Sequence, residues 1–174
     1  MERGGKTLTG VERHFPDSEI IVTKTDTRGW ITYANEVFSA ISGYAEAESL
    51  GQPHSLIRHP HMPRCVFKLL WDTIEAGHEI FAYVNNRAKN GDHYWVFAHV
   101  TPTFASGGNI VGYHSSRRSP KRSAIDAVVP LYDRLLRAEQ AAADRKTGLA
   151  ASTAMLHDLL ARHGKSYDAF VLSL

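Results

Sequence analysis

The sequence NGD at residues 90–92 constrains the fold of this chain more than any other feature. Two apolar runs flank it, residues 79–86 and 93–104, and the second alternates between apolar and polar side chains like a half-buried strand. An Asn-Gly pair between such runs is a strong signal of a β-hairpin, because its tight turn needs positive φ angles. Residues 110–117 give a further strand signal. The second half of the chain therefore predicts an antiparallel sheet.

The first half of the chain adds two strands and several short helices. Residues 19–26 form a β-branched apolar run, and a turn ending at Gly29 separates it from a second short run at residues 30–33. From Asn35, a residue type that caps helices, apolar residues recur at helical spacing, and further helical stretches follow as far as Gly77. This order predicts an α+β fold with a five-stranded antiparallel sheet and short helices on one face.

The last third of the chain is rich in alanine and leucine at helical spacing. Residues 123–146 predict an amphipathic helix that is broken near Pro130 and ends at Thr147-Gly148. Residues 149–163 predict a second helix, and we expect the apolar end of the chain to dock on the rest. The chain thus divides into a flexible or loosely docked lead-in (residues 1–18), a folded domain (19–120) and a C-terminal helical extension (121–174).

Charge and cysteine content exclude several classes of protein. The chain has 20 Lys and Arg against 18 Asp and Glu, without the dense basic tracts that nucleic-acid binding requires. Its single cysteine excludes an internal disulfide and CxxC motifs, which favours a reducing, cytoplasmic setting. No apolar stretch approaches the ~18 residues of a membrane span, so we expect no direct membrane insertion. No nucleophile elbow, phosphate-binding loop or kinase motif is present, so we expect no enzymatic activity.

Four stretches of the sequence resemble PAS domains. The generic features are TDTRGWITYANEVFSAISGY (residues 25–44), KNGDHYWVFAHVTP (89–102) and IVGYHSSRR (110–118). Between them, GQPHSLIRHPHMPRCVFKLLWDTIEAG (51–77) resembles the Aer-type PAS domains of aerotaxis and energy-taxis receptors, which hold FAD non-covalently. The resemblance covers roughly residues 19–120, and it implies a PAS fold whose sheet and short helices enclose the cofactor.

The resemblance also implies which residues would bind FAD. Arg58, His59 and His61 would line the entrance of the pocket, and Trp71 would flank the flavin ring. The other implied contacts are Asn86, Asn35, His54 and Tyr113. Asn85 is a further candidate, because two asparagines within a strand pattern are unusual and one of them should face inward and need a partner. The chemistry agrees, because a guanidinium binds pyrophosphate through parallel charge-assisted hydrogen bonds and a flat ring needs an apolar slot with a few amides at its edge.

Two positions depart from the family pattern. The family usually has an aspartate where His61 stands, and it tends to have a tryptophan where Ile80 stands. These departures leave open a haem-b-binding gas sensor, because haem needs only one axial histidine. A structural metal is not expected, since the chain lacks a Cys/His array. Cys65 is interpreted as a small buried residue, because RCVFK only faintly resembles the cysteine motif of light-sensing flavin domains.

The function implied by the resemblance is a cytoplasmic sensor of redox or oxygen state for aerotaxis or energy-taxis signalling. A chemotaxis receptor or another signalling protein would be its partner, and a homodimer is expected. The final YDAFVLSL reads like a natural terminus, which favours a stand-alone protein over a receptor fragment. A ligand-free PAS interaction module remains a further alternative.

Overall fold

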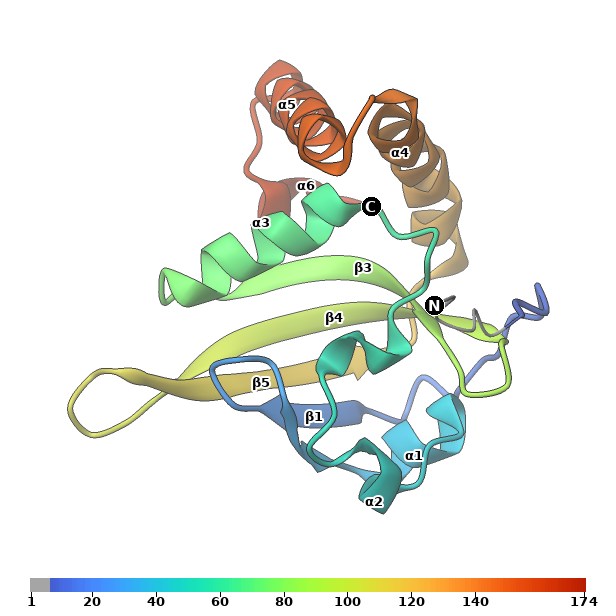
Figure 1. The fold of residues 1–174 in the computed structure, drawn as a ribbon, viewed down its shortest axis with the longest axis vertical. Helices are drawn as coiled ribbons and strands as arrows, with labels where there is room; N and C mark the ends of the chain where they lie inside the picture. Colours follow the sequence, from blue (N-terminus) through green and yellow to red (C-terminus); the bar gives the residue numbers. More distant parts are fainter. Residues whose placement is uncertain (1–6) are drawn as a thin grey trace.

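The computed structural model describes residues 7–174 and contains a five-stranded antiparallel sheet in the order β2-β1-β5-β4-β3 (Figure 1). The strands are β1 (Ile21–Thr25), β2 (Ile31–Ala34), β3 (Ile80–Arg87), β4 (His93–Phe104) and β5 (Ile110–Arg118). The helices α1 (Glu36–Ser42), α2 (Glu46–Ser49) and α3 (Arg64–Glu75), with the 3-10 helix η1 (His54–Ile57), cover one face, which we call the inner face. The predicted α+β class, the five strands and the short helices on one face are confirmed.

The predicted hairpin is formed by β3 and β4, which pair in a continuous antiparallel register. Gly91 adopts a φ of 98°, a value that glycine reaches without steric cost, and the strands pair from Arg87–His93 to Ile80–Val100. Along β4, every second residue from Tyr94 to Val100 is buried, and Ala98 and Val100 line the inner face. The alternation of the sequence therefore sets which side of the sheet belongs to the core.

The C-terminal extension forms α4 (Arg122–Ala141), α5 (Arg145–His163) and α6 (Tyr167–Val171). The predicted break at Pro130 is wrong, because α4 continues through it. Pro130 lies on the exposed side of the helix, where water can hydrate the carbonyl group that loses its partner. No helix in residues 7–174 combines the length and apolar character needed to cross a membrane.

The predicted stop at Thr147-Gly148 is also wrong. The chain turns earlier, where the Asp144 carboxylate caps α5 by accepting hydrogen bonds from the backbone N–H groups of Lys146 and Thr147. Gly148 lies inside α5, and a Cβ there would be 2.4 Å from the carbonyl oxygen of Glu139. This glycine thus permits close packing of α5 against α4 instead of ending a helix.

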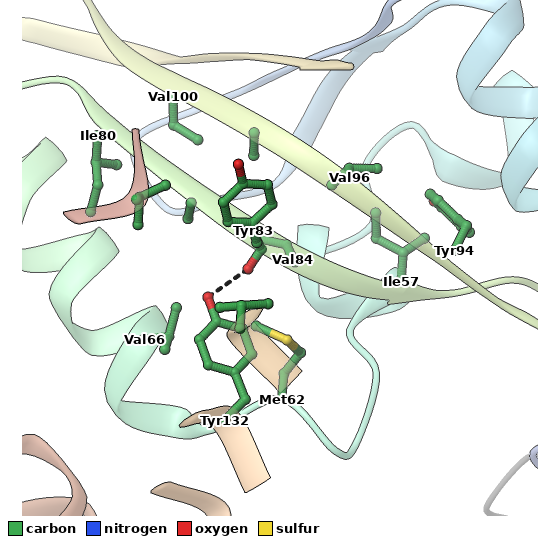
Figure 2. Close-up of a cluster of buried hydrophobic side chains, with 14 of the residues drawn as sticks. Ile57, Met62, Val66, Ile80, Tyr83, Val84, Tyr94, Val96, Val100 and Tyr132 are labelled. Atoms are coloured by element: carbon green, nitrogen blue, oxygen red, sulfur yellow. Dashed lines mark hydrogen bonds between the residues drawn. The ribbon is translucent and has the colours of Figure 1, made fainter. Parts of the chain in front are cut away.

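The free edge of β3 is covered by the C-terminal helices. The Asp168 carboxylate of α6 accepts a hydrogen bond from the Phe81 backbone N–H at 3.0 Å. The Tyr132 hydroxyl of α4 donates to the Tyr83 carbonyl oxygen at 2.7 Å (Figure 2). The predicted docking of the apolar C-terminal segment is therefore confirmed, and it protects a strand edge that would otherwise be open to pairing.

The expected loose docking of the lead-in is wrong for residues 7–15. The Thr9 hydroxyl and the Arg13 guanidinium donate to the Asp92 carboxylate at 2.6 and 2.8 Å, and Phe15 is buried. Hydrogen bonds from Thr9, Asn90 and Arg13 lower the pKa of Asp92 to about 2. The segment is held because this nearly buried carboxylate in the hairpin turn needs donors. The expectation for residues 1–6 lies outside the described residues.

Candidate functional site

A cavity of about 750 Å3 lies between the inner face of the sheet and the segment formed by η1 and α3. Its apolar walls consist of Ile57, Phe67, Leu70, Trp71, Ile74, Val84, Ala98 and Val100. This volume falls within the roughly 300–1,000 Å3 of small-molecule sites. The cavity also has a polar end and a basic mouth, so it offers a flat apolar ligand a few specific polar contacts.

Five of the nine residues predicted for the site line this cavity: His54, Arg58, Trp71, Asn86 and Tyr113. Arg58 and Asn86 are brought together by an antiparallel bridge between their backbones. The rings of Trp71 and Tyr113 meet edge to face, with centroids 5.5 Å apart. Gly29 leaves room for the tryptophan, because a Cβ at that position would lie 2.9 Å from its Cη2.

Asn35 and Asn85 do not line the cavity. The Asn35 side-chain oxygen accepts from the backbone N–H groups of Phe38 and Val22, and its side-chain NH2 donates to the Ile20 carbonyl oxygen, so Asn35 caps α1 and joins it to β1. Asn85 points to the opposite side of β3 from Asn86, because side chains alternate along a strand.

His59 and His61 lie beside the cavity without lining it. The His59 ring contacts the rings of His61 and His93, with centroids 4.9 and 5.7 Å away, and its Nδ1 accepts from the His61 backbone N–H. Burial, followed by the charges of these two histidines, lowers the pKa of His59 to about 4. The His59 ring is therefore neutral at neutral pH. Within residues 7–174, no three His, Cys, Asp or Glu side chains are placed to hold a metal ion.

Arg117 is one of the cavity residues that the sequence did not predict. It is 2% exposed, and its Nη2 donates to the Thr23 hydroxyl, while Nε and Nη1 have no partner within residues 7–174. The Asn86 side-chain nitrogen is likewise buried without a partner in the described chain. Burial lowers the pKa of Arg117 to about 10, so the group stays charged at neutral pH. Period-two alternation from Tyr113 along β5 could have identified it, since both residues face inward.

His54 extends the polar end of the cavity. Its Nε2 lies 3.0 Å from the Thr23 hydroxyl, which accepts from Arg117 and can therefore donate its own hydrogen to the imidazole. Burial, followed by the Arg117 charge, lowers the pKa of His54 to about 3, so the ring is neutral. We call Arg117, Thr23 and His54 the polar relay. Arg117 can only donate, whereas the Thr23 hydroxyl and the His54 imidazole can exchange donor and acceptor roles without a net change in charge.

Cys65 does not face the cavity. It is 1% exposed on α3, and burial raises the pKa of its thiol. Its backbone N–H donates to Glu139 of α4 at 3.0 Å. The expectation of a small buried residue is confirmed, and this placement disfavours a covalent cysteine adduct with a ligand in the cavity.

Comparisons with known proteins identify a family and several relatives that match this chain. The family described as "PAS fold" matches residues 31–117. The aerotaxis receptor of Escherichia coli strain K12 is 43% identical over 119 residues, which are 68% of this chain and 23% of the receptor. A nitrogen fixation regulatory protein of Klebsiella pneumoniae is 29% identical over the same shares of the two chains. This chain thus spans about a quarter of the length of these two relatives.

A solved structure agrees with the sequence comparisons. The dark structure of the blue-light photoreceptor Aureochrome1 LOV superposes with a TM-score of 0.54 at 26% identity, and the match covers 69% of this chain and 83% of that one. The matched regions therefore share both sequence and architecture with sensory and regulatory proteins.

Proposed function

The chain belongs to the PAS fold family, and on that premise we propose that it is a sensory protein that binds FAD non-covalently and responds to redox or oxygen state. The observation that carries this proposal is Arg117, a buried residue that lines the apolar cavity and whose guanidinium has two nitrogens without a hydrogen-bond partner in residues 7–174. A buried polar group without a partner costs about 1–3 kcal/mol or more, so its retention is understandable if a ligand supplies the acceptor.

The cavity suits a flavin in shape and chemistry. Trp71 and Tyr113 offer aromatic walls to a flat ring, while Asn86 and Arg117 offer hydrogen-bond donors to the carbonyl oxygens and ring nitrogens at its polar edge. Arg58, at the mouth, carries a charge that suits a pyrophosphate. We propose these residues, with His54, as the binding site, and we leave Asn35 and Asn85 as structural residues.

Bound FAD would supply reversible redox chemistry that changes the charge and protonation of the polar edge of its ring. Arg117 would hold a positive charge beside that edge, and the Thr23 hydroxyl would rotate to match the new pattern of donors and acceptors. Because Thr23 lies on β1 and pairs with Ser115 of β5, this rearrangement would act on the middle of the sheet. Differential contacts of this kind are what a two-state sensor requires.

The outer face of the sheet is the proposed route to a partner. Phe81 stacks on His99 with ring centroids 4.2 Å apart, and Phe97 lies between Phe81 and Tyr83. Partly exposed aromatic side chains are typical of interaction surfaces. The similarity to an aerotaxis receptor supports a cytoplasmic signalling context, so we propose a homodimer or a chemotaxis receptor or other signalling protein as the partner.

Haem b remains the rival ligand. His54 is the only histidine among the described residues that line the cavity, and its Nε2 already contacts Thr23. Haem ligation by His54 would require breaking its contact with Thr23, whereas FAD binding would not. The geometry therefore favours flavin.

Replacing Trp71 with alanine is expected to weaken FAD binding about thirtyfold, because the ring would lose about 2 kcal/mol of stacking and apolar contact. Trp95→Ala is the matched control, since Trp95 is similarly half-buried but lies on the outer face beside Tyr132. Titration with FAD, followed by the change in its fluorescence, measures both affinities. Unchanged FAD affinity in the Trp71 variant, or an equal loss in both variants, would contradict the proposed binding site.

A further inference from the structure

We propose that the start of helix α5, together with Arg58 and Arg64, supplies an anion-binding subsite for the phosphate-bearing tail of the ligand. The inference rests on the proposed function and adds that a helix outside the matched family region, residues 31–117, completes the ligand site. Arg145, Lys146 and Leu149 of α5 line the cavity together with the residues of the PAS fold.

The position of the subsite follows from two neighbouring hollows. A second hollow of about 450 Å3 lies between the loop that precedes α3 and helix α4, with Met62 and Leu136 in its walls. Arg58, Arg64 and Arg145 line both hollows, and we call these three residues the arginine junction. A ligand with phosphates in its middle and a ring system at each end, such as a dinucleotide, matches two hollows that share three guanidinium groups.

Helix α5 is held at the arginine junction by specific contacts. Arg64 Nε pairs with the Glu139 carboxylate at 2.9 Å, and Arg64 Nη1 donates to the Arg145 backbone carbonyl at 2.8 Å. Glu139 also accepts from the Ser152 hydroxyl of α5 at 2.9 Å. The backbone at Arg145 therefore stays beside Arg64 whatever side chain it carries.

Protein carboxylates balance only one of the three charges at the arginine junction, that of Arg64. Arg58 and Arg145 have no ion-pair partner within residues 7–174, and no aspartate or glutamate lines the first cavity. Glu139, which lines the second hollow, is engaged by Arg64. Burial, with the charges of Arg64 and Arg145, lowers the pKa of Arg58, while Glu139 opposes the shift. Like charges this close repel each other, and a bound phosphate would remove the repulsion.

The test compares two flavins that differ in their phosphates, FAD and riboflavin, on the full chain. Arg145→Ala is expected to weaken FAD about tenfold, the size of a lost charge-assisted hydrogen bond, and to change riboflavin affinity less than about twofold. Arg162→Ala removes the same charge from the far end of α5 and is the matched control. Both affinities are measured by fluorescence titration, and circular dichroism checks that the variants are folded.

The possible results distinguish a failure of the subsite from a failure of the proposed function. An equal loss for both flavins, or no loss for FAD, would overturn the subsite while the proposed function stands. If the wild-type chain binds neither flavin, the proposed function fails and ADP becomes the probe. ADP binding that Arg145→Ala weakens about tenfold would then support the subsite. ADP binding that is absent, or that this substitution leaves unchanged, would overturn it.

Discussion

Arg117→Met is expected to stabilise the ligand-free chain and to weaken FAD binding about a hundredfold. The ligand-free chain buries a guanidinium with two unpartnered donor groups, so an apolar side chain of similar length should raise the free energy of unfolding by about 2 kcal/mol. The same substitution would remove the charged hydrogen bonds that we propose between Arg117 and FAD, each worth about 1.5–3 kcal/mol. Opposite effects on stability and affinity are typical of a residue kept for function.

The neighbouring Arg118 provides the control, because it is exposed and its side chain alternates to the outer face. Arg118→Met should change both quantities little. Urea unfolding of the ligand-free protein measures the change in the free energy of unfolding, and titration with FAD measures the change in affinity. If Arg117→Met destabilises the ligand-free chain, Arg117 is a structural residue and the argument for a ligand at the polar end of the cavity is lost.

Glu139→Gln is expected to lower the free energy of unfolding by about 3 kcal/mol, the cost of breaking a largely buried ion pair. The Glu139 carboxylate accepts from the Arg64 side chain, the Cys65 backbone N–H and the Ser152 hydroxyl. An amide has one accepting atom in place of two, so at least one of these donors would lose its partner.

Asp133→Asn makes the same chemical change at an exposed position of α4 and should cost less than about 0.5 kcal/mol. Urea unfolding compares the two variants with the wild-type chain. Equal stability of the two variants would show that Glu139 does not hold the C-terminal helices against α3, and the proposed role of α5 in the ligand site would lose its foundation.

The strands and turns could be predicted from the sequence because local chemistry determines them. The hairpin turn at Gly91 and the cap at Asn35 involve residue types with strong conformational preferences, and both occur where expected. The motif around Arg58 and Trp71 likewise pointed to the cavity, because it lies on consecutive elements that cover the inner face.

The contacts that depend on distant parts of the chain could not be predicted. Gly148 looks like a helix stop, and only the approach of Glu139 from α4 makes it an interior residue. Asp92 gives no sign in the sequence that it holds the lead-in through Arg13. Arg117 and Arg118 form a basic pair, and strand alternation indicates only that one of them faces inward. That the inward residue is buried follows from the final packing of the chain.

The absorption spectrum of the freshly purified chain, with identification of any ligand released on denaturation, tests the central claim most directly. The account predicts the spectrum of oxidised flavin and stoichiometric release of FAD. A Soret band from haem would contradict it, as would a colourless protein that takes up no FAD on reconstitution.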